Sequence, residues 1–292
     1  MLEHIIKNDQ VCATISDHGA ELRSLVILKE NKEIMWQADP KYWGRTSPVL
    51  FPIVGGLWEN KYAYKGVTYS MPKHGFARDM DFTLVSEADD ELVFELHDNE
   101  ETRKMYPFAF TLRIGYKLIG SKLDVTYTVV NDNEGTMCFS IGAHPAFNCD
   151  LTTDKLLFEK NGEPVSDTLK SGVIAMDSGC LSDKVIEVKT NEAVLSLSPE
   201  LFDEDALIID ERQSDSVTLL RAADDHKVKV SFDAPLFGVW SPDKKNAPFV
   251  CIEPWNGRCD RVGYSGSLEE REHGNTLSQD GVFTSTFSIE IK

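Results

Sequence analysis

The chain has 292 residues, of which 41% are hydrophobic, so it holds enough apolar material for a substantial core. Its 48 acidic and 30 basic residues give a formal net charge of −18. This charge repels nucleic acid phosphates and anionic lipid headgroups, and we expect neither nucleic acid nor a membrane as a partner.

The first 20 residues, MLEHIIKNDQVCATISDHGA, lack the basic segment and following apolar stretch of a secretion signal. No apolar run approaches the roughly 18 residues that a membrane-spanning helix needs. The six cysteines are scattered, without the C-x-x-C spacing of zinc and redox sites, and fit reduced, buried thiols. We therefore expect a cytoplasmic protein.

Apolar and polar residues alternate along most of the chain, which predicts antiparallel β-strands. In residues 61–71, KYAYKGVTYSM, two alternating runs flank Lys65 and Gly66, and the pattern predicts a hairpin with these two residues at its turn. Further hairpins are predicted in residues 82–98, 108–132 and 216–233.

No linker rich in serine, glycine or proline divides these strands, and we predict one domain over residues 1–292. So many strands in one unit favour an all-β fold, a single large antiparallel β-sandwich, because one open sheet of this size would curl or split. Residues 160–184, rich in glycine and polar residues, predict an extended excursion from that core.

The first segment that could carry chemistry is residues 71–82, MPKHGFARDMDF. Gly75 removes a side chain next to His74 and allows a ligand or another backbone to approach closely. Lys73 and Arg78 add positive charge nearby. A loop histidine with solvated neighbours is an equally good interpretation of this segment alone.

The second segment is SIGAHPAFNC, residues 140–149. Pro145 disfavours a helical conformation for the residue before it and holds His144 extended at the end of a predicted strand. A buried core histidine with its hydrogen bonds satisfied is the alternative.

The third segment is PFVCIEPWNGRCD, residues 248–260, where an apolar strand is predicted to end at Glu253. A carboxylate in such a place costs free energy unless it is paired, hydrogen-bonded or open to a cavity. Trp255 offers a flat apolar face of the kind that packs against sugar rings. An edge-strand glutamate in water is the alternative.

Two imidazoles and a carboxylate are the parts of an acid–base pair with an orienting group. The chain shows no G-x-S-x-G elbow, phosphate-binding loop or dinucleotide fingerprint, so acyl transfer, phosphoryl transfer and dehydrogenation lack support. A metal site of His74, His144 and Glu253 is a further alternative. These residues lack the close spacing common in such sites, and we expect no metal.

Six segments stand in an order that resembles the aldose 1-epimerase (galactose mutarotase) superfamily, and its LacX-like branch most. They are WGRTSPVLFPIVG, KHGFARDMDF, GAHPAF, LFDEDALI, FGVW and CIEPWNG. The resemblance covers nearly the whole chain. It implies a galactose mutarotase-like supersandwich, with the site in a cleft on one sheet and no metal or cofactor. It also implies an isomerase that interconverts the α and β anomers of a hexose or hexose phosphate.

The resemblance also implies the catalytic roles. Glu253 would be the general base that takes the proton from the anomeric hydroxyl, O1. His144 would be the general acid that protonates the ring oxygen. His74 would hydrogen-bond near that ring oxygen and orient the sugar.

For substrate binding, the resemblance implies that Arg45 and Asp205 hold sugar hydroxyls and that Trp240 makes an aromatic contact. Arg78, with Lys73 and Arg45, could favour a sugar phosphate. We expect a small sugar or sugar phosphate as partner and a monomer or homodimer. A carbohydrate-binding or sensor protein without turnover is the alternative on the same fold.

Overall fold

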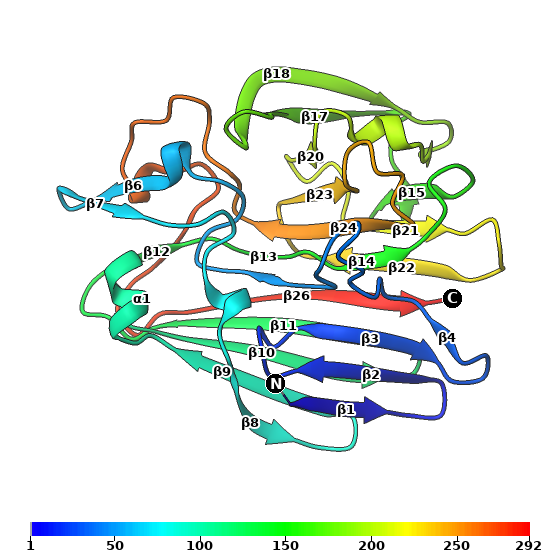
Figure 1. Cartoon of the computed structure of the whole chain (residues 1–292), viewed down its shortest axis with the longest axis horizontal. Coiled ribbons are helices and arrows are strands. Elements are labelled where there is room, and N and C mark those ends of the chain that lie inside the picture. Colours follow the sequence, from blue (N-terminus) through cyan, green and yellow to red (C-terminus); the bar gives the residue numbers. More distant parts are fainter. Residues whose placement is uncertain (1) are drawn as a thin grey trace.

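The computed structural model describes residues 2–292 and consists mainly of antiparallel strands (Figure 1). Over these residues the largest sheet has ten strands, in the order β16-β15-β21-β22-β26-β11-β10-β9-β8, with β19 beside β15. Its strands are β8 (Thr83–Glu87), β9 (Glu91–His97), β10 (Phe110–Ile119), β11 (Lys122–Asn131), β15 (Lys155–Lys160), β16 (Glu163–Pro164), β19 (Val194–Ser196), β21 (Ser216–Leu220), β22 (Lys227–Phe232) and β26 (Val282–Ile291).

The second large sheet has eight strands within the described range, in the order β18-β17-β20-β23-β24-β13-β5, with β14 beside β24. Its strands are β5 (Val49–Leu50), β13 (Ile141–Ala143), β14 (Ala146–Asn148), β17 (Thr168–Ala175), β18 (Cys180–Lys189), β20 (Leu207–Ile209), β23 (Leu236–Trp240) and β24 (Phe249–Asn256).

Smaller elements complete the fold. A four-stranded sheet consists of β1 (Glu3–Lys7), β2 (Val11–Ser16), β3 (Leu22–Ile27) and β4 (Lys32–Glu33). Two strand pairs are β6 (Lys61–Tyr64) with β7 (Val67–Ser70) and β12 (Met137–Phe139) with β25 (Asn275–Leu277). The helical turns are α1 (Glu100–Met105), η1 (Trp58–Asn60), η2 (Ala77–Asp79), η3 (Pro199–Phe202) and η4 (Leu268–Glu270). None of the helices in residues 2–292 has the length and apolar character to cross a membrane.

The predicted hairpins are confirmed. β6 and β7 pair with Lys65 and Gly66 at the turn, and both turn residues have positive φ, as a two-residue turn between twisted strands requires. β8 pairs with β9, β10 with β11 and β21 with β22, each at the predicted place.

The main core lies between the two large sheets. Val250 and Ile252 of β24 belong to the same buried cluster as Val228 and Val230 of β22. The four-stranded sheet contributes to this cluster too, and the Tyr116 hydroxyl of β10 donates a hydrogen bond to the Ala20 carbonyl. Because side chains alternate along a strand, Cys251, Glu253 and Trp255 of β24 point to the opposite face of the eight-stranded sheet.

The segment predicted as an extended excursion instead forms regular structure. β17 and β18 pair over most of their length and form one edge of the eight-stranded sheet, at the top of Figure 1. Leu169, Ser171 and Val173 are buried on β17, so the alternation is present. Ser171 and the neighbouring Gly172 interrupt the apolar pattern and conceal the strand in the sequence.

Candidate active site

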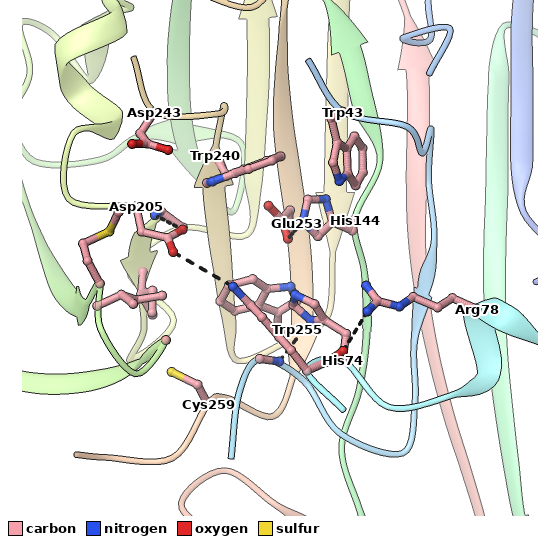
Figure 2. A pocket seen from close by; sticks show the side chains of 17 residues that line it. Trp43, His74, Arg78, His144, Asp205, Trp240, Asp243, Glu253, Trp255 and Cys259 are labelled. Carbon is pink, nitrogen blue, oxygen red and sulfur yellow. Dashed lines mark hydrogen bonds and ion pairs between the residues drawn. The ribbon is translucent and has the colours of Figure 1, made fainter. Parts of the chain in front are cut away.

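A cavity of about 320 Å³ opens on the face of the eight-stranded sheet that points away from the main core (Figure 2). This volume is at the lower end of the usual range for small-molecule sites. The lining residues are Trp43, Gly55, Lys73, His74, Arg78, His144, Ile174, Met176, Gly179, Asp205, Ala206, Ile208, Trp240, Asp243, Glu253, Trp255 and Cys259.

The strand register explains why His144 and Glu253 meet. β24 pairs with β13 through Gly142 and Trp255, and with β14 through Ala146 and Cys251. His144 lies midway between Gly142 and Ala146, and Glu253 lies midway between Cys251 and Trp255. The two side chains are therefore opposite each other on neighbouring strands, where cross-strand partners are in contact.

The predicted end of the strand at Glu253 is wrong, because β24 continues to Asn256. The neighbour of β24 changes from β14 to β13 at this point, and His144 and Pro145 lie between those two strands. Pro254 lacks an N–H, and a proline is tolerated in a strand where the ladder is interrupted. The break in the ladder thus accommodates Pro254 and gives the cavity access to His144.

The His144 ring and the Glu253 carboxylate form a buried pair. His144 Nε2 lies 3.2 Å from Glu253 Oε2, and the two residues are 8% and 1% exposed. The two groups are not aligned as a hydrogen bond, and Glu253 Oε2 has no hydrogen-bond partner among residues 2–292. An unpartnered buried carboxylate oxygen is costly, and Glu253 is a lining residue of a cavity from which a ligand can donate.

The environment favours the uncharged form of both groups. Burial lowers the pKa of His144 to about 3, and the charge of Lys73 adds to this effect. Burial also raises the pKa of Glu253 well above its ordinary value, with a further contribution from Asp205. The surroundings of the free site therefore favour a neutral imidazole beside a protonated carboxyl group, an arrangement in which the pair has one proton that can move between the two residues.

Aromatic rings hold the His144 imidazole in place. The Trp43 ring stacks on it at 4.7 Å between centroids, and the Trp240 ring meets it edge-on at 5.4 Å. Figure 2 shows this arrangement above Glu253. Contacts on two sides restrict rotation of the ring, so the nitrogen facing Glu253 is fixed by packing.

His74 enters the cavity from a tight loop. His74 and Gly75 both have a φ of 70°, and a Cβ on Gly75 would lie 2.2 Å from the Phe51 carbonyl oxygen. The close backbone approach expected from Gly75 is thus confirmed. A bulky residue with positive φ stores strain, which is typical of functional positions.

The tautomer of His74 follows from its backbone contact. The Gly55 N–H donates to His74 Nδ1 at 3.1 Å, so this nitrogen carries the lone pair. Burial lowers the pKa of His74 well below its usual value, and the charge of Lys73 adds to the effect. The ring is therefore neutral with its proton on Nε2, which makes His74 an uncharged hydrogen-bond donor.

Trp255 covers the floor of the cavity because glycine stands beside it on both neighbouring strands. A Cβ on Gly142 or on Gly238 would lie 2.7 Å from atoms of the indole ring. Without those side chains the ring can lie across the sheet, and Figure 2 shows it below Glu253 and beside His74.

Charged side chains also line the cavity. Lys73 Nζ lies 4.0 Å from Asp205 Oδ2, and Asp205 has a φ of 69° two residues before β20 begins. The Arg78 guanidinium donates to the Lys73 carbonyl at 2.7 Å and holds the His74 loop. These residues leave both a cation and an anion within reach of a polar ligand.

The structure brings six of the seven predicted site residues to one cavity: His74, Arg78, His144, Asp205, Trp240 and Glu253. Arg45 is not among the lining residues, and its guanidinium pairs with Asp79 at 2.7 Å. Sequence reasoning did not assign Trp43, Met176 or Asp243, which also line the cavity. The available signal for Trp43 was its position, because it is an aromatic residue two positions before the predicted site residue Arg45.

The model of the family described as aldose 1-epimerase matches residues 3–268. This chain belongs to the aldose 1-epimerase family. Protein LacX (chromosomal) from Lactococcus lactis subsp. lactis is 32% identical over 295 residues, which cover 98% of this chain and 95% of that protein. The resemblance to the LacX-like branch is therefore confirmed.

Solved structures of family members have the same fold. A galactose mutarotase related enzyme from Lactobacillus acidophilus is similar with a TM-score of 0.93 and 37% identity, over 100% of this chain and 97% of that one. A galactose mutarotase-like protein from Lactobacillus casei ATCC 334 gives 0.92 and 32% identity over 100% of both chains. The expected galactose mutarotase-like, all-β fold with large antiparallel sheets is confirmed.

Proposed function

We propose that this protein is a mutarotase that interconverts the α and β anomers of a hexose or hexose phosphate by general acid–base catalysis. The observation that supports this most directly is the buried His144–Glu253 pair at the floor of a cavity sized for a small ligand. The pair holds one mobile proton and an unpartnered carboxylate oxygen.

The reaction requires one proton to leave O1 and one to reach the ring oxygen, so that the bond from C1 to the ring oxygen breaks and the aldehyde can rotate. Transfer of the proton from Glu253 to His144 across 3.2 Å produces a carboxylate and an imidazolium. Sugar hydroxyls that donate to Glu253 stabilise the carboxylate and favour this transfer. Glu253 then accepts the O1 proton, and His144 donates to the ring oxygen. Ring closure on the other face reverses the roles.

His74 supports the same step without a net charge. Its Nε2–H donor can hydrogen-bond the ring oxygen, where negative charge develops as the C1 bond breaks. Because the Gly55 N–H fixes the tautomer, this donor is oriented before the sugar enters.

The remaining lining residues match the surfaces of a hexose. The flat face of Trp255 can pack against sugar C–H groups, and Trp240 closes one side. Asp205 and Lys73 offer an acceptor and a donor for hydroxyls. Lys73 and Arg78 are also the residues that would bind a phosphate group on the substrate, with Arg45 available if its contact with Asp79 opens.

The test is anomer interconversion measured by proton NMR exchange on glucose, galactose and their 6-phosphates. Wild-type protein should accelerate exchange, and Glu253→Gln should lose at least roughly 100-fold in rate, as expected for loss of a positioned acid–base group. Glu95→Gln, on the outer face of the ten-stranded sheet, is the matched control and should keep the full rate.

Sugar binding measured by calorimetry on the same variants distinguishes a mutarotase from a carbohydrate-binding protein without turnover. Binding without acceleration on any sugar would overturn the mutarotase and leave a carbohydrate-binding protein. Exchange at equal rates on free sugars and their 6-phosphates would rule out a specific phosphate contact by Lys73 and Arg78.

A further inference from the structure

We propose that a binding site for a thiophilic divalent cation such as Zn²⁺ lies at the edge of the cavity, with the lining residues His144 and Glu253 and the fully buried Cys251 behind them as its protein ligands. The site goes beyond the proposed reaction and does not depend on it. It differs from the metal alternative drawn from the sequence, because Cys251 takes the place of His74.

The three donor atoms already lie close together. One nitrogen of His144, Cys251 Sγ and one oxygen of Glu253 are all within 4.8 Å of one another, and all three residues are buried. The strand geometry requires this arrangement. Cys251 and Glu253 are two positions apart on β24 and share a face, while His144 is opposite Glu253 and diagonal to Cys251.

The spacing of the His144–Glu253 contact is also compatible with two ligands of one metal ion. Two ligands on a tetrahedral zinc, with bonds of about 2.0 to 2.1 Å, are separated by about 3.3 Å. His144 Nε2 and Glu253 Oε2 lie 3.2 Å apart and are not aligned for donation. Within the described chain, Glu253 Oε2 has no hydrogen-bond partner although it is buried.

The donor set selects the kind of cation. One sulfur, one imidazole nitrogen and one carboxylate oxygen suit Zn²⁺, whereas Mg²⁺ and Ca²⁺ require oxygen ligands. A divalent ion would also neutralise a thiolate and a carboxylate that would otherwise be buried charges. The cavity leaves a fourth position for water or a ligand, as in zinc sites with three protein ligands.

Metal binding and the proposed catalysis exclude each other. A bound cation would occupy the imidazole nitrogen and the carboxylate oxygen between which the proton moves. The metal should therefore inhibit mutarotation, and sugar and metal should compete for the cavity.

The experiment is a titration of the full-length protein with Co²⁺, which reports a thiolate ligand through a charge-transfer absorption band in the near ultraviolet. Wild-type protein should show this band, and Zn²⁺ should displace it. Cys251→Ser should lose the band. Cys259→Ser is the matched control, because Cys259 lines the same cavity outside the three ligands, and it should keep the band.

Zn²⁺ affinity measured by calorimetry should fall at least roughly tenfold in Cys251→Ser, because loss of a partner outside the ligand shell alone costs about 10- to 100-fold. Circular dichroism establishes that both variants are folded. A band that persists in Cys251→Ser, or that disappears in Cys259→Ser, would overturn the assignment, as would its absence in the wild type. These readouts decide the question whether or not the protein accelerates anomer exchange.

Discussion

The two large sheets differ in how regular they are. In the ten-stranded sheet, short turns join β8 to β9, β10 to β11 and β21 to β22, and β10 and β11 pair along ten residues each. Its outer face carries charges in contact with water, such as Arg113 paired with Glu95. In the eight-stranded sheet, the ladder beside β24 is interrupted at His144 and Pro145, and the outer face buries a carboxyl group and two histidines.

The comparison separates the sources of stability and of chemistry. Regular pairing with buried apolar residues stabilises the fold, whereas buried ionisable groups cost free energy. The site lies where strand pairing is broken and polar groups are desolvated. The stabilisation from the regular sheet offsets the free-energy cost of those groups. This division predicts that substitutions in the two sheets change different measurable properties.

The largest effect is expected in the ten-stranded sheet. Phe94 of β9 is fully buried and packs against Tyr116. Phe94→Ala should lower the free energy of unfolding by about 3 to 5 kcal/mol, because the core cannot fill the cavity. Denaturant unfolding measures this loss. Sugar affinity of the remaining folded protein should be unchanged, and a loss of affinity equal to that of a site variant would contradict the comparison.

A matched pair of glycine substitutions sharpens the comparison between the two large sheets. In Gly238→Ala the new Cβ would lie 2.7 Å from the Trp255 ring, which must move, so we expect a loss of about 1 to 3 kcal/mol in stability and weaker sugar binding. In Gly115→Ala, on β10, the nearest atom lies 3.9 Å away, and a gain of about 0.5 to 1 kcal/mol is expected. Thermal unfolding and calorimetry of both variants provide the measurements. Equal effects on sugar binding would argue against the role of the Trp255 floor.

A smaller effect than those of the substitutions is expected for each unit of pH in the pH dependence of kcat/KM, which reports the free enzyme. The competent pair carries one proton, so the rate should fall on the acid side only as His144 gains a second proton near pH 3, about tenfold per unit. An acid limb at the ordinary histidine value of about 6.5 would contradict the neutral pair. The alkaline limb should lie well above the usual glutamate range.

The lowered pKa of His144 also determines how the free energy of unfolding changes with pH. Between about pH 6.5 and pH 3 the unfolded chain binds a proton at residue 144 and the folded chain does not. The His144 contribution is therefore fully present above pH 6.5 and is lost as the pH falls towards 3. Unfolding curves at each pH define the range in which the rate profile is valid.

The hairpins of the β6–β7 pair and of the ten-stranded sheet could be predicted because alternation and turn chemistry are local. Lys65-Gly66 and Gly120-Ser121 each join two patterned runs without help from distant residues. β17 was missed because Ser171 and Gly172 break the apolar pattern, while a long-range sheet partner keeps the segment extended. Local pattern carries no information about such a partner.

The site was predicted as three separate segments whose meeting no local signal contains. Pro145 indicates an unusual position for His144, and the apolar run before Glu253 does the same for that carboxylate. Only the register of β13, β14 and β24 places the two residues opposite each other. The strand is predicted to end at Glu253, and Pro254 directly after it would normally interrupt ladder pairing. Its tolerance depends on a gap contributed by residues about 110 positions earlier in the chain.

The distribution of tryptophan gives the molecule an optical property. Three of its five tryptophans, Trp43, Trp240 and Trp255, line the cavity, and Trp43 stacks directly on His144. Intrinsic fluorescence is therefore weighted towards the site and away from the regular sheet. The protein carries its own reporter of the protonation and occupancy of the pocket, without an attached label.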